Sequence, residues 1–446
     1  MSDKISIIHR SLKIRLYPDK NQKILLNKTF GCCRLLYNER LAEHIEWYNA
    51  NKGLPKDQRS KFKGKLPKQL REEKYEFLSD AIAEPLIQSQ RNCEQAFSNF
   101  FKSITKQRKG KKVGFPKFKS KKQHRDSFSI YMLPKNCLDW EHRLVAIPKL
   151  KQVKFRHAED KSKKWIGWFK EATIRSMTIS RNACEEYWCS ILFEREQDIY
   201  STICPIKAIG LDFSPNSLYI NDLNEVAPGF RKAKQENKKK LTRLQRNLMK
   251  KQKDSKNREK ARIKLAQFEN HIANIRRDYR EKETLRLVRT YDIIGIEDLN
   301  LQGMMKFSHN AKNYVDCSWY SFVTRLEQKA KSNNCLIIKS DRFYPSSKTC
   351  NHCGYVNKNL KLSDRTWICP KYEAEIIRDQ NAALNLKENA LKILLEEIKS
   401  SLLLEQQEVM SMEDMEINLC NSEICGVSVE VENQSGDALK KKLFGL

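Results

Sequence analysis

The stretch IGLDF at residues 209–213 places one acidic residue near the end of a short apolar run. Such a run is typical of a buried β-strand, which we predict over 208–213. The stretch IIGIE at residues 293–297 has the same form. A carboxylate inside an apolar strand is costly unless it is paired or binds a metal ion. We therefore take Asp212 and Glu297 as candidate catalytic metal ligands.

A third acidic residue, Asp379, occurs in RDQNAALN at residues 378–385, where a helix is predicted to begin. Two strand ends and a helix start can bring three carboxylates together, and carboxylate oxygens suit Mg²⁺. Two such ions could activate water and stabilise the leaving oxygen in phosphodiester hydrolysis. Each acid alone is explained more simply as a strand-end or helix-cap residue. Three of them in one basic chain favour the metal site. Asp298 is the nearest alternative to Glu297, but neighbouring strand residues face opposite sides.

Two short turns farther along the chain carry cysteines: CNHCG at residues 350–354 and CPKYE at residues 369–373. Paired C-x-x-C turns are typical of a zinc ribbon, in which four thiolates bind Zn²⁺ in a tetrahedron. This chain supplies three of the four ligands: Cys350, Cys353 and Cys369.

The second turn departs from that pattern. Tyr372 stands where the fourth cysteine is expected, and Glu373 stands where glycine usually follows. A structural zinc site is normally closed by four ligands, so we expect weakened zinc binding and impaired cleavage. Each replacement can arise from a single G-to-A change, which suggests a gene copy that is decaying. The alternative is a genuine variant in which His352, Glu373, Glu375 or water completes the site.

Strands alternating with helices indicate an α/β core over about 206–395. Further strands are predicted over 217–220 and 335–339, and a helix over 320–331. Residues 230–289 are long, charged and helical. Their apolar positions from Ala261 to Tyr279 step by 4, 3, 4, 3 and 4, the spacing of a coiled-coil seam, which predicts an antiparallel helical pair.

The N-terminal part is predicted to begin with a strand over 11–16 and to continue mostly as helix to residue 101. Asp19 and Gln22 have the spacing of a capping box at the first helix start. Residues 128–194 contain short apolar or alternating runs separated by polar turns. They predict a small β-barrel or sheet module.

A basic loop separates these two regions: residues 102–125 hold eleven Lys or Arg and no acidic residue. A charge run is usually a solvated loop. Here aromatic rings lie among the cations, which favours binding of a nucleic-acid strand, with cations on phosphates and rings on bases. The candidate binding residues are Phe115, Lys117, Phe118, Lys119, Lys121 and Lys122.

The whole chain has 446 residues, 85 Lys or Arg and 55 Asp or Glu, for a net charge of +30. This charge points to a polyanionic partner, first of all nucleic acid, and argues against a small-molecule metabolic enzyme. With 40% apolar residues, the chain is not simply a disordered basic tail. No secretory signal or membrane span is apparent. We therefore expect reduced cysteines and a cytoplasmic location.

Taken together, these stretches resemble the TnpB proteins of bacterial insertion sequences, relatives of the type V CRISPR nucleases. The similarity runs from about residue 11 to residue 394. Besides the cysteine turns, it rests on RLYP (15–18), FGCCR (30–34), GFPKFK (114–119), GLDFS (210–214), GIEDLN (295–300) and RDQNAA (378–383). The family often has His-Asp before the last Arg-Asp, where this chain has Ile376 and Ile377.

The resemblance implies a multidomain α/β protein with an RNase H-like (RuvC) nuclease core. The expected layout is a β-barrel wedge domain (1–16 and 126–205), a helical recognition domain with the basic loop (17–125), the core (206–345) with a helical hairpin (230–290), a zinc-ribbon insert (346–376), the last core segment (377–400) and a disordered acidic tail (401–446).

The resemblance also implies the activity and its partners. A guide RNA would pair with one strand of a double-stranded target DNA, and the RuvC site would cut with two Mg²⁺ ions held by Asp212, Glu297 and Asp379. The transposase of the same element is a further expected partner. A guided repressor or an accessory DNA-binding protein that does not cut is the first alternative, but such relatives lose the acidic triad. A tyrosine strand-transferase would need metal-binding His neighbours, and no His-x-His pair occurs.

Overall fold

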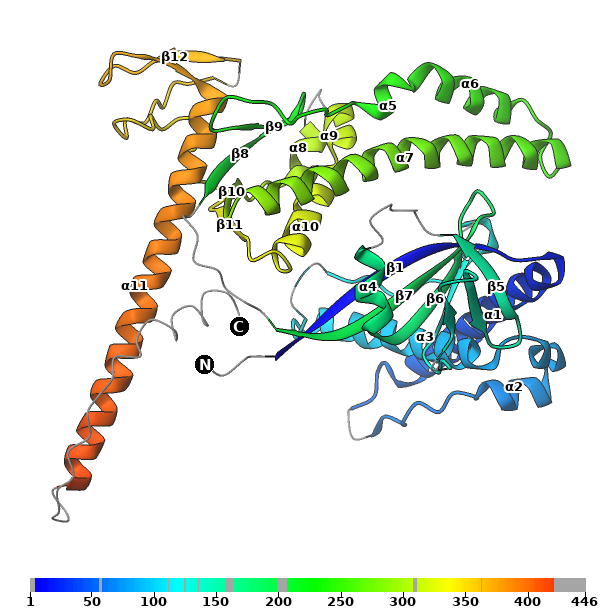
Figure 1. Cartoon of the computed structure of the whole chain (residues 1–446). Helices are drawn as coiled ribbons and strands as arrows, with labels where there is room; N and C mark the ends of the chain where they lie inside the picture. Colours follow the sequence, from blue (N-terminus) through cyan, green and yellow to red (C-terminus); the bar gives the residue numbers. More distant parts are fainter. Residues whose placement is uncertain are drawn as a thin grey trace. The chain divides into compact units, whose positions relative to one another are not determined.

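A computed structural model describes residues 5–55, 58–108, 110, 112–123, 126–134, 136–156, 164–198, 207–307, 311–361 and 363–420. The chain divides into two compact units (Figure 1). The first comprises residues 1–198 and 252–267, and the second comprises residues 199–251 and 268–446. None of the described helices is both long enough and apolar enough to span a membrane.

The first unit combines helices with one sheet. Its elements are β1 (Ile5–Tyr17), α1 (Lys20–Asn51), α2 (Pro67–Glu73), a 3₁₀ turn (Glu76–Asp80), α3 (Ala83–Ile104), a 3₁₀ turn (Lys121–Gln123), β2 (Asp126–Ile130), β3 (Leu138–Asp139), β4 (Leu144–Ile147), β5 (Lys151–Arg156), α4 (Lys164–Glu171), β6 (Thr173–Arg181) and β7 (Tyr187–Asp198).

The sheet of this unit has seven strands in the order β2-β6-β7-β1-β5-β4-β3. All its pairings are antiparallel, and β1 pairs with β7 along nearly its whole length. The expected strands over 128–194 are confirmed. Closure into a barrel is not, because no pairing joins the edge strands β2 and β3 among the described residues. The module is therefore an open sheet.

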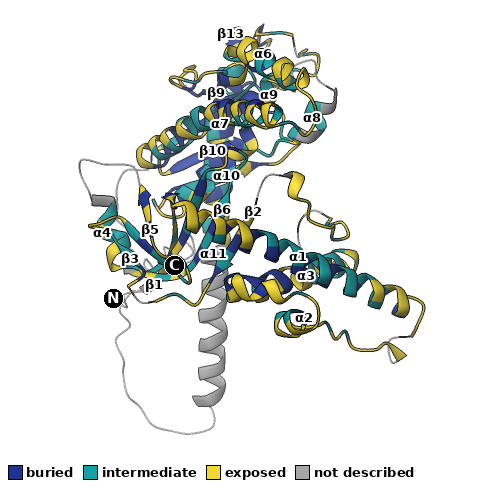
Figure 2. Ribbon diagram, turned by 90° about the vertical axis from the view of Figure 1, so that its right-hand side faces the viewer, coloured by how far each residue is buried: buried dark blue, intermediate teal, exposed yellow. Residues whose placement is uncertain are grey.

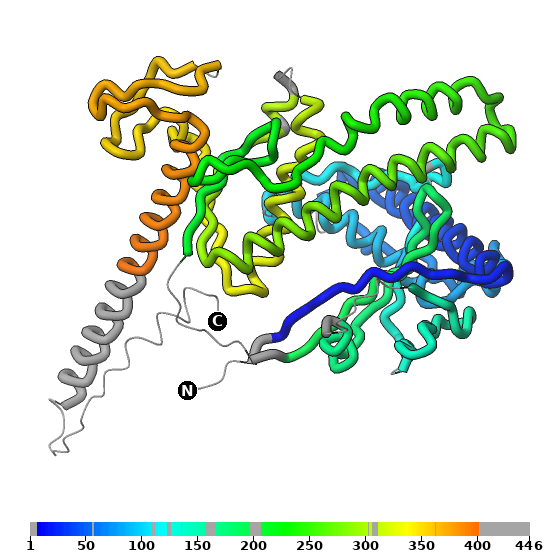
Figure 3. Tube along the Cα trace, turned by 45° about the horizontal axis from the view of Figure 1, so that its top comes forward, coloured from blue at the N-terminus to red at the C-terminus, as the bar shows by residue number. Residues whose placement is uncertain are grey.

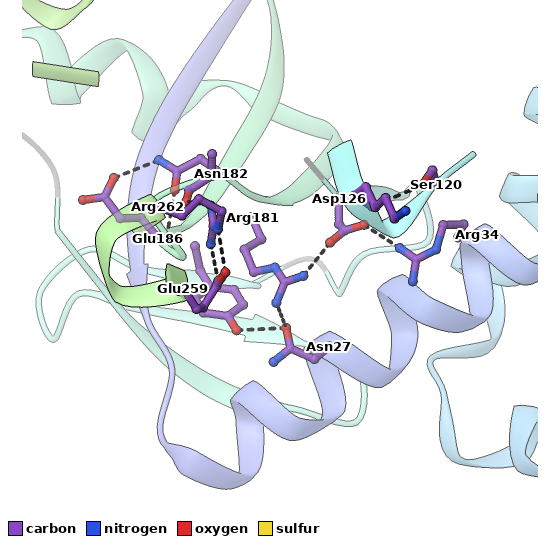
Figure 4. Close-up of polar contacts among 12 residues, drawn as sticks. Asn27, Arg34, Ser120, Asp126, Arg181, Asn182, Glu186, Glu259 and Arg262 are labelled. Atoms are coloured by element: carbon purple, nitrogen blue, oxygen red, sulfur yellow. Dashed lines mark hydrogen bonds and ion pairs between the residues drawn. The ribbon is translucent and has the colours of Figure 1, made fainter. Parts of the chain in front are cut away.

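Helix α1 begins as the sequence predicts. Asp19 caps it: its side chain accepts from the N–H of Gln22, whose side chain accepts from the N–H of Asp19. Figure 4 shows how the helix is joined to the sheet. Asp126 of β2 accepts from Arg34 of α1 at 2.8 Å and from Arg181 of β6 at 2.6 Å. This shared carboxylate fixes α1 against the edge of the sheet.

The second unit contains the rest of the secondary structure, and α7 also contributes its first turns to the first unit. Its elements are β8 (Ala208–Ser214), β9 (Leu218–Asn221), α5 (Ala233–Glu236), α6 (Lys238–Met249), α7 (Lys256–Thr290), β10 (Ile293–Glu297), α8 (Leu301–Phe307), α9 (Ala311–Cys317), α10 (Trp319–Ala330), β11 (Leu336–Ser340), β12 (Thr366–Ile368), β13 (Glu375–Ile377) and α11 (Arg378–Cys420).

Helices α6 and α7 run antiparallel beside each other, as the apolar spacing predicts (Figure 3). Leu241 of α6 and Phe268 and Ile272 of α7 are buried. The ammonium group of Lys240 lies 4.4 Å from the ring centroid of Phe268, so α6 also places a cation over the seam.

The sheet of this unit has four strands in the order β11-β10-β8-β9. Strand β10 is parallel to both β8 and β11, while β9 is antiparallel to β8. The first four residues of β10 are buried (Figure 2). One face of the sheet packs on α10 and the end of α7 through Ile209, Leu211, Ile294 and Ile296. The other face packs on α11. The expected α/β core is thus three layers with a mixed sheet in the middle.

Helix α11 corrects one expectation. The sequence predicted a disordered acidic tail from residue 401, because no clear helical period persists there. The helix instead continues to Cys420. An apolar stripe with the helical period is needed when a helix packs on a core, but a continuous helix can form without such a stripe. Residues 421–446 lie outside the described part of the chain.

Candidate active site and metal centre

Two glycines allow the last helix to lie close to the sheet. Gly210 of β8 and Gly295 of β10 are neighbours in the parallel register. A Cβ atom at Gly210 would lie 1.8 Å from the carbonyl oxygen of Ala383, and one at Gly295 would lie 2.3 Å from that of Leu386. Both carbonyls belong to α11, so a side chain at either position would push the helix away.

These glycines also fix where the catalytic candidates point. Strand side chains alternate between faces, so Asp212 and Glu297, each two residues after a glycine, face α11 as well. Asp298 faces the other way and pairs with Arg342 at 2.6 Å. The sequence-based choice of Glu297 over Asp298 therefore agrees with the geometry.

Asp379, the third candidate, is the second residue of α11. Its Oδ2 atom accepts a hydrogen bond from Arg365 at 3.2 Å. Its Oδ1 atom is buried and lies 3.2 Å from Nε of Arg378, in an ion pair that lacks hydrogen-bond geometry. The two guanidinium groups therefore hold this carboxylate at the start of the helix.

The charges of Glu297 and Asp379 both act on the buried carboxyl group of Asp212. Burial raises the pKa of Asp212 well above its usual value, and the charges of Glu297 and Asp379 raise it further, while Arg378 opposes the rise. Burial also raises the pKa of Glu297 against a hydrogen bond from Ser346. Crowded carboxyl groups with raised pKa values favour a cation that neutralises them.

The donor set fits a hard divalent cation, since it consists of carboxylate oxygens. In the part of the chain that the structure describes, however, the three acids do not form a compact cluster. The group whose possible ligand atoms all lie within 4.8 Å of one another is Cys350, Cys353 and Cys369.

The cysteine turns form a small core of their own, with Cys350, Cys369, Trp367 and Ile376 buried. Burial raises the pKa of Cys350, although the backbone N–H groups of Cys353 and His352 oppose this. The pKa of Cys369 is lowered: burial works against ionisation, but the N–H groups of Lys371 and Tyr372 and the two other thiols outweigh it. Backbone amides aimed at a thiolate suit a zinc turn.

No fourth ligand joins this cluster among the described residues. Tyr372 is 47% exposed, and its ring stacks on His352 with centroids 4.3 Å apart. His352, Glu373 and Glu375 are not part of the group of possible metal ligands. The three thiols thus fit zinc as three ligands.

The first cysteine turn is joined to α11 by two buried asparagines, Asn381 and Asn385, each 3% exposed. Their Nδ2 atoms both donate to the carbonyl of Thr349 at 2.7 Å, and Asn385 also donates to the carbonyl of Ser346 at 2.7 Å. In return their Oδ1 atoms accept from the backbone and side-chain nitrogens of Asn351 at 2.9 and 3.2 Å.

The sequence analysis missed several of these residues. A signal was present for the asparagines, because Asn381 and Asn385 are four residues apart and so share one helix face just after Asp379. Ser346, which bonds to Glu297, and Arg365, which bonds to Asp379, carried no such signal. They reach the acids from segments that are distant in sequence.

The basic-loop candidates fall into two groups. Phe115 packs edge-on against Phe97 and Phe100 of α3, with centroids 5.3 and 5.1 Å away. The backbone of Lys119 exchanges two hydrogen bonds with Asn38, and its ammonium group lies 3.9 Å from the ring centroid of Tyr37. These two anchor the loop. All six candidates are exposed, and the other four are Lys117, Phe118, Lys121 and Lys122.

A second basic surface lies on α6, where one face lines an open hollow of about 700 Å³. No described acidic side chain forms an ion pair with the cations of this face. The lining residues are Lys238, Lys239, Thr242, Arg243, Arg246, Asn247 and Lys250. This unneutralised charge could accept phosphate groups.

Three segments match known protein families. Residues 6–53 match a family described as "Helix-turn-helix domain", residues 194–308 one described as "Probable transposase", and residues 319–386 one described as "Cas12f1-like, TNB domain". The last match contains the cysteine turns and both asparagines. The first covers β1 and one continuous helix, α1.

Whole-chain relatives extend these matches. A Streptomyces pristinaespiralis protein named "Putative RNA-guided DNA endonuclease" is 31% identical over 385 residues, 85% of this chain and 89% of that protein. "Putative RNA-guided DNA endonuclease InsQ" of Escherichia coli K12 is 28% identical over 399 residues, 84% of this chain and 91% of that protein. A solved Cas12f1–sgRNA–target DNA complex aligns with a TM-score of 0.47 at 14% identity, over 85% of this chain and 99% of that one.

Proposed function

The chain belongs to the TnpB family of RNA-guided DNA endonucleases, and on this premise we propose that it hydrolyses phosphodiester bonds of double-stranded DNA chosen by a guide RNA. The observation that supports the proposal is that Asp212 and Glu297 lie near the ends of the adjacent strands β8 and β10, and that the charges of Glu297 and Asp379 act on the buried carboxyl group of Asp212. A chain that only bound nucleic acid would have no use for this costly arrangement.

The three acids are the proposed ligands of Mg²⁺. When bound, the metal would supply an activated water and stabilise the leaving oxygen. Asp212 provides a buried carboxylate whose charge is unfavourable without a cation. Ser346 orients Glu297 by a hydrogen bond to Oε1. Arg365 and Arg378 hold Asp379 and offset part of the negative charge.

The domain roles follow as part of the same proposal. The four-stranded sheet with its helices would be the nuclease core, the cysteine turns the zinc ribbon beside its last acid, and the seven-stranded sheet with α1 and α3 the wedge and recognition parts. Exposed Phe118, Lys117, Lys121 and Lys122 and the basic face of α6 are proposed to contact the guide RNA or the DNA.

One observation keeps a second function in view. The cysteine cluster offers three possible ligands, whereas a structural zinc site has four. A guided DNA-binding protein that no longer cuts would tolerate that loss. The retained acids speak for cleavage, and the two functions differ in one measurable product, the broken DNA strand.

The test begins with the RNA that co-purifies with the expressed protein. We expect one discrete RNA species, and Mg²⁺-dependent cutting of a plasmid that carries a sequence matching its guide portion. The control is the same complex with Asp212→Asn, which should bind the RNA and leave the plasmid intact. Heterogeneous host RNA would contradict the guided function. A discrete RNA with target binding but no cutting by the wild type would favour the repressor.

A further inference from the structure

The contacts of Asn381 and Asn385 connect the first cysteine turn to the catalytic acids. The asparagines lie two and six residues after Asp379 on α11, and their amides hold the carbonyls of Ser346 and Thr349 and the nitrogens of Asn351. Ser346 in turn donates its hydroxyl to Glu297. Segment 346–351 is therefore bonded to the helix of one acid and to the side chain of another.

We propose that Asn381, Asn385 and Ser346 form an amide clamp, a set of positioning residues that holds the catalytic carboxylates in place independently of the ribbon's metal. The proposal rests on the proposed nuclease function, because it names which residues set the geometry of that site. It differs from the sequence-based expectation that a missing fourth zinc ligand would impair cleavage.

Burial makes the clamp strong. Asn381, Asn385 and Ser346 are at most 3% exposed. Removing the amide of Asn385 takes this donor away from the carbonyl of Ser346, in a place that water reaches poorly, which costs more than the lost bond alone. Both asparagines use their donor and their acceptor, so segment 346–351 has a single favoured position on α11.

The second cysteine turn reaches Asp379 without help from a metal. Strands β12 and β13 pair antiparallel, Thr366 with Ile377 and Ile368 with Glu375, and the N–H of Arg378 donates to the carbonyl of Arg365 at 2.9 Å. These backbone bonds and the guanidinium of Arg365 set the start of α11 while Tyr372 occupies the ligand position. The ribbon's zinc and the placement of the acids are thus separable.

The test compares Asn385→Ala and Ser346→Ala with a matched control, Asn389→Ala. Asn389 lies one turn farther along α11 and bonds to Ser340, outside the clamp. Residues that orient metal ligands typically contribute 10- to 100-fold to metal affinity or activity. We expect the clamp variants to raise the Mg²⁺ concentration needed for half-maximal cutting by about 10-fold or more, with guide RNA binding unchanged and the control near wild type.

A second readout does not depend on cutting. Mg²⁺ bound at the acids should raise the melting temperature of the protein, and the clamp variants should need more Mg²⁺ for the same rise. A variant that lowers only the folded fraction would leave the Mg²⁺ dependence unchanged, and that result would overturn the clamp. If the wild type binds Mg²⁺ at the acids but never cuts, the nuclease proposal fails while this readout still decides the clamp.

Discussion

The two cysteine turns of the ribbon have the same backbone and different side chains. In the first, the N–H of Gly354 donates to the carbonyl of Cys350 at 2.9 Å, and in the second the N–H of Glu373 donates to the carbonyl of Cys369 at 2.7 Å. The returning bonds also correspond, from Cys350 to Tyr355 and from Cys369 to Ala374. Backbone hydrogen bonds thus give both turns the same shape, although the second has Tyr372 and Glu373 where the first has Cys353 and Gly354.

The difference lies in what each turn contributes. The first turn supplies Cys350 and Cys353 and is bonded to α11 through Asn381 and Asn385. The second supplies one thiol and pays a conformational cost, because Glu373 has a φ of +56°, in the region where Gly354 has a φ of +72°. The first turn therefore supports the catalytic helix, and the second chiefly completes the metal site.

The largest effect concerns the acids that both turns adjoin. Asp212→Ala, Glu297→Ala and Asp379→Ala should each lower guided plasmid cutting by about 10³-fold or more, because each removes a metal ligand from a site that acts as a unit. Guide RNA binding should stay at the wild-type level. Cutting near wild type by any one variant would show that this acid is misassigned.

The next largest effect is expected from substitutions that give the second turn the cysteine and glycine of the first. Tyr372→Cys combined with Glu373→Gly should raise the zinc content to one tightly held ion per chain, because four thiolates close the tetrahedron. The zinc content per chain is measured by metal analysis after the protein has been incubated with a competing chelator and separated from it by gel filtration. The matched control, Tyr372→Phe with Glu373→Gly, should gain no zinc. If the unaltered chain already holds one zinc as tightly, another residue supplies the fourth ligand.

A smaller effect is expected from the backbone conformation of the second turn alone. Glu373→Gly alone should stabilise the protein by about 1 kcal/mol, because it removes a left-handed conformation from a residue with a Cβ, and should raise Tm by about 2 °C. Gly354→Glu should have the opposite sign. A Cβ at Gly354 meets no atom within 4 Å, so this change tests the conformation alone. Equal melting temperatures for all three proteins would contradict the comparison.

The smallest effect concerns pH. The native pKa of Asp212 is raised, so the native state holds this proton more strongly than the unfolded chain, where Asp titrates near 3.9. Stability of the metal-free protein should then fall as pH rises above about 4 toward the raised native pKa. Asp212→Asn should lose less stability than wild type as the pH rises above about 4 in EDTA. Parallel pH profiles would argue against a buried, crowded carboxyl group.

Much of the site was predictable because its signals are local. An acid in an apolar strand, a C-x-x-C turn and a capping box each reveal themselves within a few residues. The rest depends on contacts between residues that are distant in sequence. These are the hydrogen bond from Ser346 to Glu297, the hydrogen bond from Asn385 to the carbonyl of Thr349, and the packing of Phe115 on α3. Closure into a barrel could not be predicted for the same reason, since local alternation predicts strands but not whether the edge strands meet.

The most direct measurement is guided plasmid cutting in Mg²⁺ by the unaltered protein, before and after its zinc is removed with a thiol-competitive chelator that leaves Mg²⁺ in solution. Zinc per chain is determined on the same samples. Because the clamp and the β12–β13 pairing hold the acids without the ribbon's metal, cutting should persist at a similar rate in the zinc-free protein. Cutting that disappears with the zinc, or that appears only after Tyr372→Cys and Glu373→Gly, would contradict the account.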